Sequence, residues 1–140
     1  MLNQRATKLN LDMKKVSADR LLLHDEASRE AANYLNGLKI TSQVVAGKAV
    51  AKGFDVQSNC GMYVGEVYTA VAIGRHGAGT KKKIRNDLNK LASSDASSKY
   101  FFVLGDPIRQ EAKSQIASDP VLQNANITVL LYDDLTQTFI

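Results

Sequence analysis

Residues 54–74 read FDVQSNCGMYVGEVYTAVAIG, and this stretch decides the fold. FDV and the apolar run GMYVGEVYTAVAIG are separated by a polar turn with Gly61, which predicts two strands paired as a hairpin. Glu66 falls in the middle of the second strand, where a buried carboxylate is costly unless it is paired or binds a cation. Asp55 and Glu66 on neighbouring strands could share one divalent ion. Alternatively, Glu66 lies on the solvated face of an edge strand and Asp55 begins a turn.

The segments on either side of this hairpin alternate between helical and strand patterns. Apolar residues recur at three- and four-residue intervals before the hairpin, which predicts a helix over 17–38 that ends at Asn36-Gly37. The face expected to be buried consists of Leu21, Leu22, Ala27, Ala31, Tyr34, Leu35 and Leu38. The remaining expected elements are a short strand at 41–47, a helix at 81–92 capped by Thr80, a strand at 99–104, a helix at 107–117 and a strand at 126–134.

The order of these elements predicts the fold class. The strands KYFFVL and NITVLLYDD are apolar throughout, as strands buried on both faces of a sheet are, and a helix precedes each one. Such connections run between parallel strands. We therefore expect an α/β fold of three layers, α/β/α, with a mixed central sheet. The chain should form a single domain over 1–140, in which 1–16 can be a loosely ordered N-terminal arm.

Composition excludes several classes of protein. With 44% apolar and 23% charged residues among 140, the chain is typical of globular proteins and not of disordered ones. No apolar run approaches the roughly 20 residues that span a bilayer, and the N-terminal residues lack an apolar signal core. We expect a cytoplasmic protein without a membrane partner.

Positive charge is concentrated in one segment. Residues 74–90 contain six basic residues and one acid, a net charge of +5, whereas the whole chain carries +4. A basic stripe of this kind is typical of a surface that binds nucleic acid, although a solvated helix face gives the same pattern. The candidate nucleic-acid contacts are Arg75, Lys81, Lys82, Lys83 and Arg85.

Taken together, several motifs resemble the PD-(D/E)xK nuclease superfamily, which has the restriction-endonuclease-like fold. They are a leading helix with acids, GFDV at 53–56, VGEVYTAV at 64–71, and a basic helix ending in NDLNKLA at 86–92 before KYFFVL. The similarity covers roughly residues 26–104. It implies a metal-dependent DNA endonuclease in which Asp55 and Glu66 hold Mg²⁺ or Mn²⁺ and phosphodiester bonds are hydrolysed.

The chain departs from the family pattern at one position. The motif lysine, which should stabilise charge on the phosphate, is replaced by Tyr68. Either Lys81 or Lys82 reaches back into the site from the following helix, or the domain binds nucleic acid or a protein without cutting. Asp87 is expected to pair with Lys83 or Lys90.

The resemblance also implies a further acid from the leading helix. Glu26 or Glu30 would fill that role as an additional metal ligand. The alternative for each is an ion pair within the helix with Arg29 or Arg20.

The expected partner is nucleic acid, and DNA in particular. At this length any sequence specificity would have to come from loops, from a homodimer or from another subunit of a larger complex. A small assembly or regulatory protein without a nucleic-acid role is a third possibility.

Overall fold

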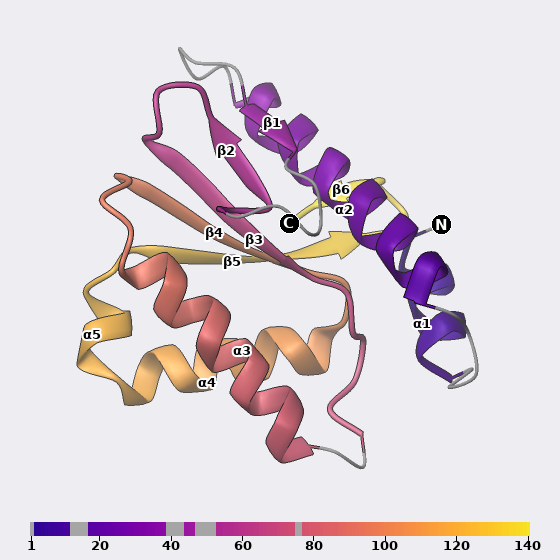
Figure 1. The fold of residues 1–140 in the computed structure, drawn as a ribbon. Coiled ribbons are helices and arrows are strands. Elements are labelled where there is room, and N and C mark those ends of the chain that lie inside the picture. Colours follow the sequence, from indigo (N-terminus) through magenta and orange to yellow (C-terminus); the bar gives the residue numbers. More distant parts are fainter. Residues whose placement is uncertain (1, 12–16, 39–43, 47–52, 75–76) are drawn as a thin grey trace.

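The computed structural model describes residues 2–11, 17–38, 44–46, 53–74 and 77–140 (Figure 1). It is an α/β fold with a mixed sheet of six strands in the order β1-β2-β3-β4-β5-β6. The helices are α1 (Leu2–Leu11), α2 (Ser17–Gly37), α3 (Gly77–Ala92), α4 (Asp106–Ser118) and α5 (Pro120–Gln123). The strands are β1 (Val44–Ala46), β2 (Val56–Ser58), β3 (Tyr63–Tyr68), β4 (Ser98–Val103), β5 (Ile127–Asp133) and β6 (Thr138–Phe139).

Strand pairing confirms the predicted hairpin and the two predicted parallel crossovers. β2 pairs with β3 in antiparallel orientation. β3 pairs with β4, and β4 with β5, in parallel orientation through α3 and α4. The last strand, β6, returns antiparallel to β5. The C-terminal segment LTQTFI at 135–140 therefore contains a strand.

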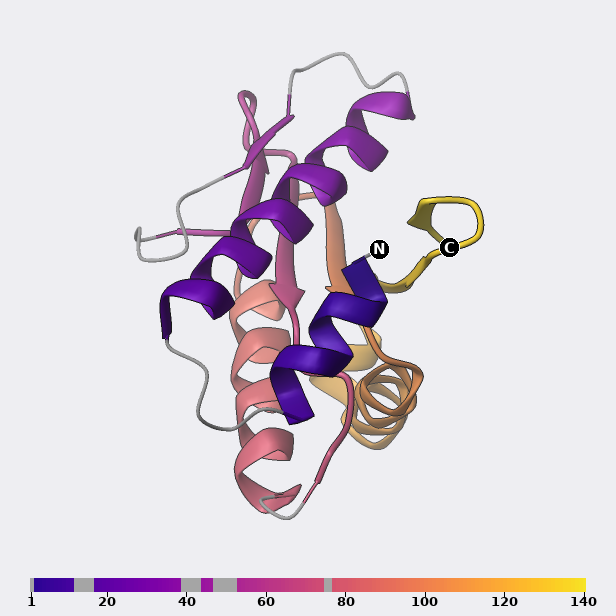
Figure 2. The ribbon, with the colours of Figure 1, turned by 90° about the vertical axis from the view of Figure 1, so that its right-hand side faces the viewer.

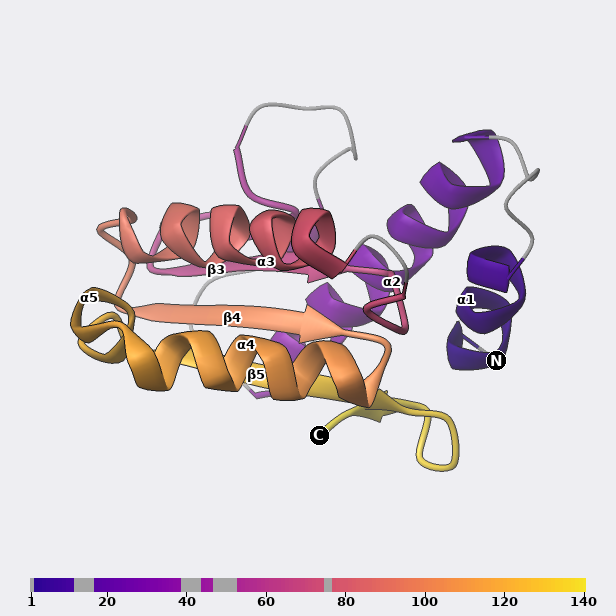
Figure 3. The same cartoon turned by 90° about the horizontal axis from the view of Figure 1, so that it is seen from below.

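The side chains of the central strands divide between two hydrophobic clusters. Because neighbouring residues of a strand point to opposite faces, Phe101 packs with buried residues of α3, α4 and α5, and Phe102 packs with those of α1, α2 and β6. Figure 2 shows α1 and α2 together in front of the strands, and Figure 3, seen from below, shows α3 and α4 side by side in front of them.

The predicted buried face of α2 is confirmed at Ala27, Ala31 and Leu35 and is wrong at Leu21, Leu22 and Leu38. Leu21, Leu22 and Leu38 are exposed by 43%, 64% and 47%, whereas Leu23 and Ala32 are buried with Ala27, Ala31 and Leu35. The contact line runs through residues four apart, which are stacked on one side of a helix. Leu21 and Leu22 lie outside that line, and Leu38 follows the end of the helix.

Two other boundaries and the burial of one strand differ from prediction. Residues 2–11, which were expected to belong to a loosely ordered arm, form α1 with Leu2 and Ala6 buried. The helix α3 begins at Gly77, so Thr80 lies inside it and donates its hydroxyl to the Ile73 carbonyl instead of capping. Most of β5 is only half-buried, because its outer neighbour β6 is two residues long.

In the part of the chain that the structure describes, no helix has the length and apolar character needed to span a membrane.

Candidate active site

Asp55 and Glu66 lie side by side at the start of the β2–β3 hairpin. The register pairs Val56 with Gly65, which places Asp55, one residue before β2, next to Glu66 in β3. The Val67 amide donates to Oδ2 of Asp55 at 2.8 Å, and the Asp55 amide donates to Oε2 of Glu66 at 3.3 Å. Glu66 is only 3% exposed, so the alternative that it lies on a solvated face is wrong.

The lysine that contacts Glu66 is Lys90 of α3. Its Nζ lies 2.5 Å from Oε1 of Glu66 and also donates to the Gly53 carbonyl. The same ammonium group lies 5.0 Å from the centre of the Phe54 ring, a cation–π distance. The last turn of α3 thus supplies a cation to a carboxylate in the middle of a strand.

A histidine from α2 lies on the other side of the pair. Nε2 of His24 is 3.3 Å from Oδ2 of Asp55. Its Nδ1 is buried and has no hydrogen-bond partner among the described residues. Burial alone would lower the pKa of His24, but the hydrogen bond and the charge of Asp55 outweigh it and the pKa is raised. Burial likewise opposes ionisation of Asp55, yet His24 and the Val67 amide hold its pKa below the ordinary value.

The two carboxylates that are not bound by His24 resist ionisation. Burial and the neighbouring Asp55 raise the pKa of Glu66 to about 8, although Lys90 acts in the opposite direction. Burial and Asp55 also raise the pKa of Asp87, in α3, to about 6. Asp87 forms no ion pair with any described residue, so its expected pairing with Lys83 or Lys90 is not found. If Asp55, Glu66 and Asp87 were all ionised, their negative charge would exceed the positive charge of Lys90 and protonated His24.

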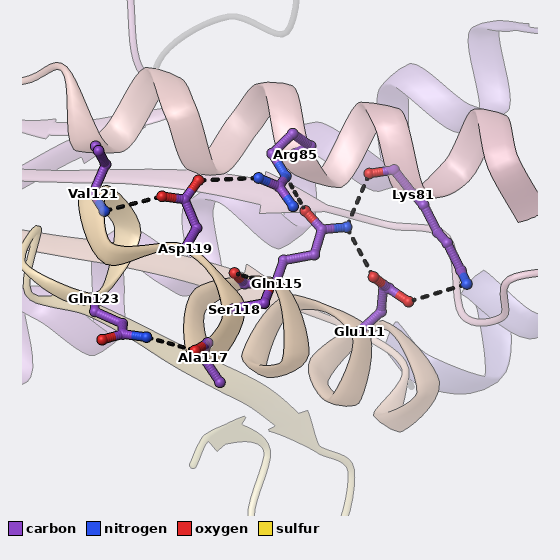
Figure 4. A network of polar contacts seen from close by, with 9 residues as sticks. All are labelled: Lys81, Arg85, Glu111, Gln115, Ala117, Ser118, Asp119, Val121 and Gln123. Carbon is purple, nitrogen blue, oxygen red and sulfur yellow. Dashed lines mark hydrogen bonds and ion pairs between the residues drawn. The ribbon is translucent and has the colours of Figure 1, made fainter.

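The predicted lysines Lys81 and Lys82 do not come to this pair. Lys81 lies 3.6 Å from Glu111 of α4, and Lys82 is exposed (Figure 4). Arg85 is also directed at α4, where it contacts Gln115 at 2.9 Å and Asp119 at 3.0 Å. Lys83 is exposed, and Arg75 lies outside the described residues.

The two acids predicted from the leading helix also lie elsewhere. Glu26 forms an ion pair with Arg5 of α1 and not with Arg29 of its own helix, and the side chain of Arg20 lies outside the described part of the structure. Glu30 lines an open pocket of about 340 Å³ at the far end of α2, next to β6. The residue of α2 that reaches the carboxylates is His24.

Tyr68, at the motif-lysine position, contacts a different part of the structure. Its ring packs against Phe101, and its hydroxyl hydrogen-bonds with Thr80 of α3. Burial and the charge of Asp87 raise the pKa of the phenol, so the hydroxyl stays neutral. Tyr68 therefore supplies no positive charge to Glu66.

The chemistry of the pair fits a hard divalent cation. Two adjacent carboxylates, one with a pKa raised to about 8, gain from a cation that would neutralise both. No group of three or more His, Cys, Asp or Glu side chains is arranged as a metal site within the described ranges. Mg²⁺ nevertheless commonly takes only one or two carboxylates and completes its shell with water and substrate phosphate. Asp55 and Glu66 could therefore hold such an ion together with water and a substrate phosphate.

Two residues of this site were not predicted. Lys90 was available in the NDLNKLA pattern, where it follows Asp87 by three positions and borders the buried line Ile84, Leu88 and Leu91. Nearness in sequence to Tyr68 favoured Lys81 and Lys82, but a helix of 16 residues carries its last turn back along the strand. His24 had a weaker signal, as a histidine beside the contact line of an amphipathic helix.

Comparisons with protein families, with curated proteins and with solved structures found no match to this chain.

Proposed function

We propose that this chain is a restriction-endonuclease-like domain of three layers that hydrolyses phosphodiester bonds in DNA with Mg²⁺ or Mn²⁺. The observation that carries the proposal is the contact of Lys90 with Glu66 beside Asp55. Two neighbouring carboxylates and one ammonium group are the groups that metal-dependent phosphodiester hydrolysis requires. In this proposal Lys90 replaces the motif lysine, whose position Tyr68 occupies.

Asp55 and Glu66 would hold the metal ion, which polarises a phosphate and lowers the pKa of a bound water. Lys90 neutralises part of the Glu66 charge and presents a positive group where charge grows on the phosphate. His24 keeps Asp55 ionised and fixes the orientation of its carboxylate. Phe54 packs against the Lys90 ammonium and limits its motion.

A second candidate is a domain that binds nucleic acid or a protein without cutting. Two observations favour it: Tyr68 is not a cation, and a third carboxylate or imidazole ligand is not arranged around the pair within the described residues. This candidate predicts DNA binding that falls with salt and does not depend on divalent ions.

The deciding experiment is cleavage of supercoiled plasmid and of a short linear duplex with Mg²⁺, with Mn²⁺ and with chelator. We expect metal-dependent nicking that is lost in Asp55→Asn and Glu66→Gln. Lys90→Met should lower the rate by about 10²- to 10³-fold, the usual effect of removing one group that stabilises transition-state charge. Lys90→Arg should retain part of the activity because the charge is kept.

The matched control is Lys113→Met, which removes an exposed lysine from α4 and should cut at the wild-type rate. Circular dichroism and urea unfolding establish that each variant is folded. Folded wild-type protein that binds DNA but cuts with none of these metals would support the second candidate. Cleavage at the wild-type rate by Glu66→Gln would refute the assignment of the site.

A further inference from the structure

The helix α3 directs its charged residues to three different sides. Its buried line is Ile84, Leu88 and Leu91. On one side of this line Lys81 and Arg85 contact Glu111 and Gln115 of α4 and Asp119, which lies between α4 and α5 (Figure 4). On the other side Thr80 contacts Tyr68, and Lys90 contacts Glu66. We refer to this second side, formed by Thr80, Lys83, Asp87 and Lys90, as the site face of α3.

Helical geometry places Lys83 on the site face and Lys82 away from it. With 3.6 residues per turn, Lys83 is rotated by about 40° from Asp87 and by about 20° from Lys90 around the helix axis. Lys82 is rotated by about 100° from Lys83 and points away from the sheet. Two lysines adjacent in sequence therefore face different surroundings.

Lys83 is also available to a ligand. It is exposed and, within the described ranges, it forms no ion pair or hydrogen bond. By contrast, Lys81 and Arg85 are paired with acids of α4. Arg75 lies outside the described residues, and of the other four basic residues that the sequence suggested as nucleic-acid contacts, Lys83 alone combines exposure and an unpaired charge with a position on the site face.

We propose that Lys83 binds a backbone phosphate of the nucleic acid and that the strand to be cut runs along the site face of α3, from Lys90 toward Thr80. This inference rests on the proposed function, because it takes the Asp55–Glu66 pair as the place where the reacting phosphate is bound.

The spacing along the helix agrees with this path. Seven residues separate Lys83 from Lys90, a rise of about 10 Å at 1.5 Å per residue. One strand of DNA advances about 3.4 Å along the duplex axis per phosphate, so Lys83 is within reach of phosphates two or three nucleotides from the reacting one. Asp87 lies between the two lysines but is less exposed than either and interacts with Asp55. The side chains of Lys83 and Lys90 are therefore more accessible to a ligand than the carboxylate of Asp87.

The test is the salt dependence of DNA binding, measured by fluorescence anisotropy with a labelled 20-base-pair duplex in chelator from 50 to 200 mM KCl. Each phosphate contact contributes about 0.9 to the slope of log K against log salt concentration. Lys83→Ala should lower the magnitude of the slope by about 0.9 and weaken binding severalfold at the lowest salt concentration. Lys83→Arg should restore the slope. Lys82→Ala removes the same charge from the same helix and should leave the slope within experimental error of wild type.

The outcomes separate this inference from the proposed function. If Lys83→Ala changes the slope and Lys82→Ala does not, the path along the site face is supported, even if no metal-dependent cleavage occurs. If Lys82→Ala and Lys83→Ala lower the slope equally, or if neither does, the inference is overturned. Metal-dependent cleavage lost in Glu66→Gln but equal in Lys83→Ala and wild type, with equal slopes, would overturn the inference and keep the proposed function.

Discussion

Glu66 is the residue whose protonation should link the stability of this protein to pH. Its pKa of about 8 lies above the ordinary 4.5, so the folded chain binds this proton more tightly than the unfolded chain. The resulting stabilisation is fully present below about pH 4.5 and is lost as pH rises through 8. His24 and Asp87, whose pKa values are also raised, act in the same direction. Asp55, whose pKa is lowered, acts in the opposite direction and only in acid.

We therefore expect the free energy of unfolding in chelator to fall between pH 5 and pH 8.5, by on the order of 3 kcal/mol. Glu66→Gln should remove most of this fall because the amide does not ionise. Urea unfolding at each pH measures it. Asp95→Asn, which removes an exposed carboxylate, serves as the control and should reproduce the wild-type profile. An unchanged pH dependence in Glu66→Gln would show that another group is responsible.

The same residue gives a test of metal binding that does not need activity. A bound cation requires both carboxylates to be ionised and stabilises the folded state by mass action. Mg²⁺ should therefore raise the melting temperature more at pH 8 than at pH 5.5, and this rise should disappear in Glu66→Gln. An equal rise in wild type and Glu66→Gln would place the ion elsewhere.

At the scale of the elements, Gly105 in the connection from β4 to α4 has the least room for a side chain among the described glycines. A Cβ added to Gly105 would lie 2.2 Å from the Val71 carbonyl oxygen and 2.5 Å from its Cα. Both are backbone atoms of the segment that leads from β3 to α3, so neither can rotate away. The close contact between these two connections keeps α3 and α4 on their strands, and α3 carries Lys90.

We expect Gly105→Ala to destabilise the fold by about 1–3 kcal/mol, the usual cost of overpacking. Gly79→Ala is the matched control, since a Cβ there meets nothing within 4 Å and the residue lies inside α3. That change should be neutral or stabilise by up to about 1 kcal/mol because alanine favours the helix. The midpoint of urea unfolding measures both. Loss of stability in both variants would mean that the Val71 contact is not the cause.

At the scale of the molecule, the C-terminal hairpin closes the hydrophobic cluster beneath α2. Phe139 is 2% exposed, and its ring centre lies 4.7 Å from that of Phe102 and 5.3 Å from that of Tyr132. A third ring, Tyr34 of α2, lies 6.5 Å away. Through these rings β6 packs against α2.

Phe139→Ala should accordingly cost about 3–5 kcal/mol, the usual range for an aromatic residue removed from a core. Ile140→Ala, one residue later and 57% exposed, should change stability by less than about 0.5 kcal/mol. Equilibrium urea unfolding measures the free energy of unfolding of both variants. Equal, small effects would show that β6 does not contribute to the core.

Much of the order of helices and strands can be predicted from local sequence patterns. The hairpin at 54–68, the strand near 98–104 and the helix after Pro107 follow from local patterns of apolar, β-branched and turn residues. The sequence also singled out Asp55 and Glu66, because a carboxylate within a strand needs a partner whatever the surrounding fold. Successive side chains of a strand point to opposite faces with a period of two residues, so this pattern can be seen in a short stretch of sequence.

The groups that contact Asp55 and Glu66 could not be predicted from local sequence, because they come from distant helices. Lys90 follows Glu66 by 24 positions and His24 precedes Asp55 by 31, and both reach the carboxylates through the packing of α3 and α2 on the sheet. Lys81, Lys82 and Arg85 carry the same charge as Lys90 on the same helix, and their rotation about its axis and their positions along it direct them to α4 or to solvent. The direction of a side chain depends on which line of the helix is buried, and that is fixed by packing against residues far away in the chain.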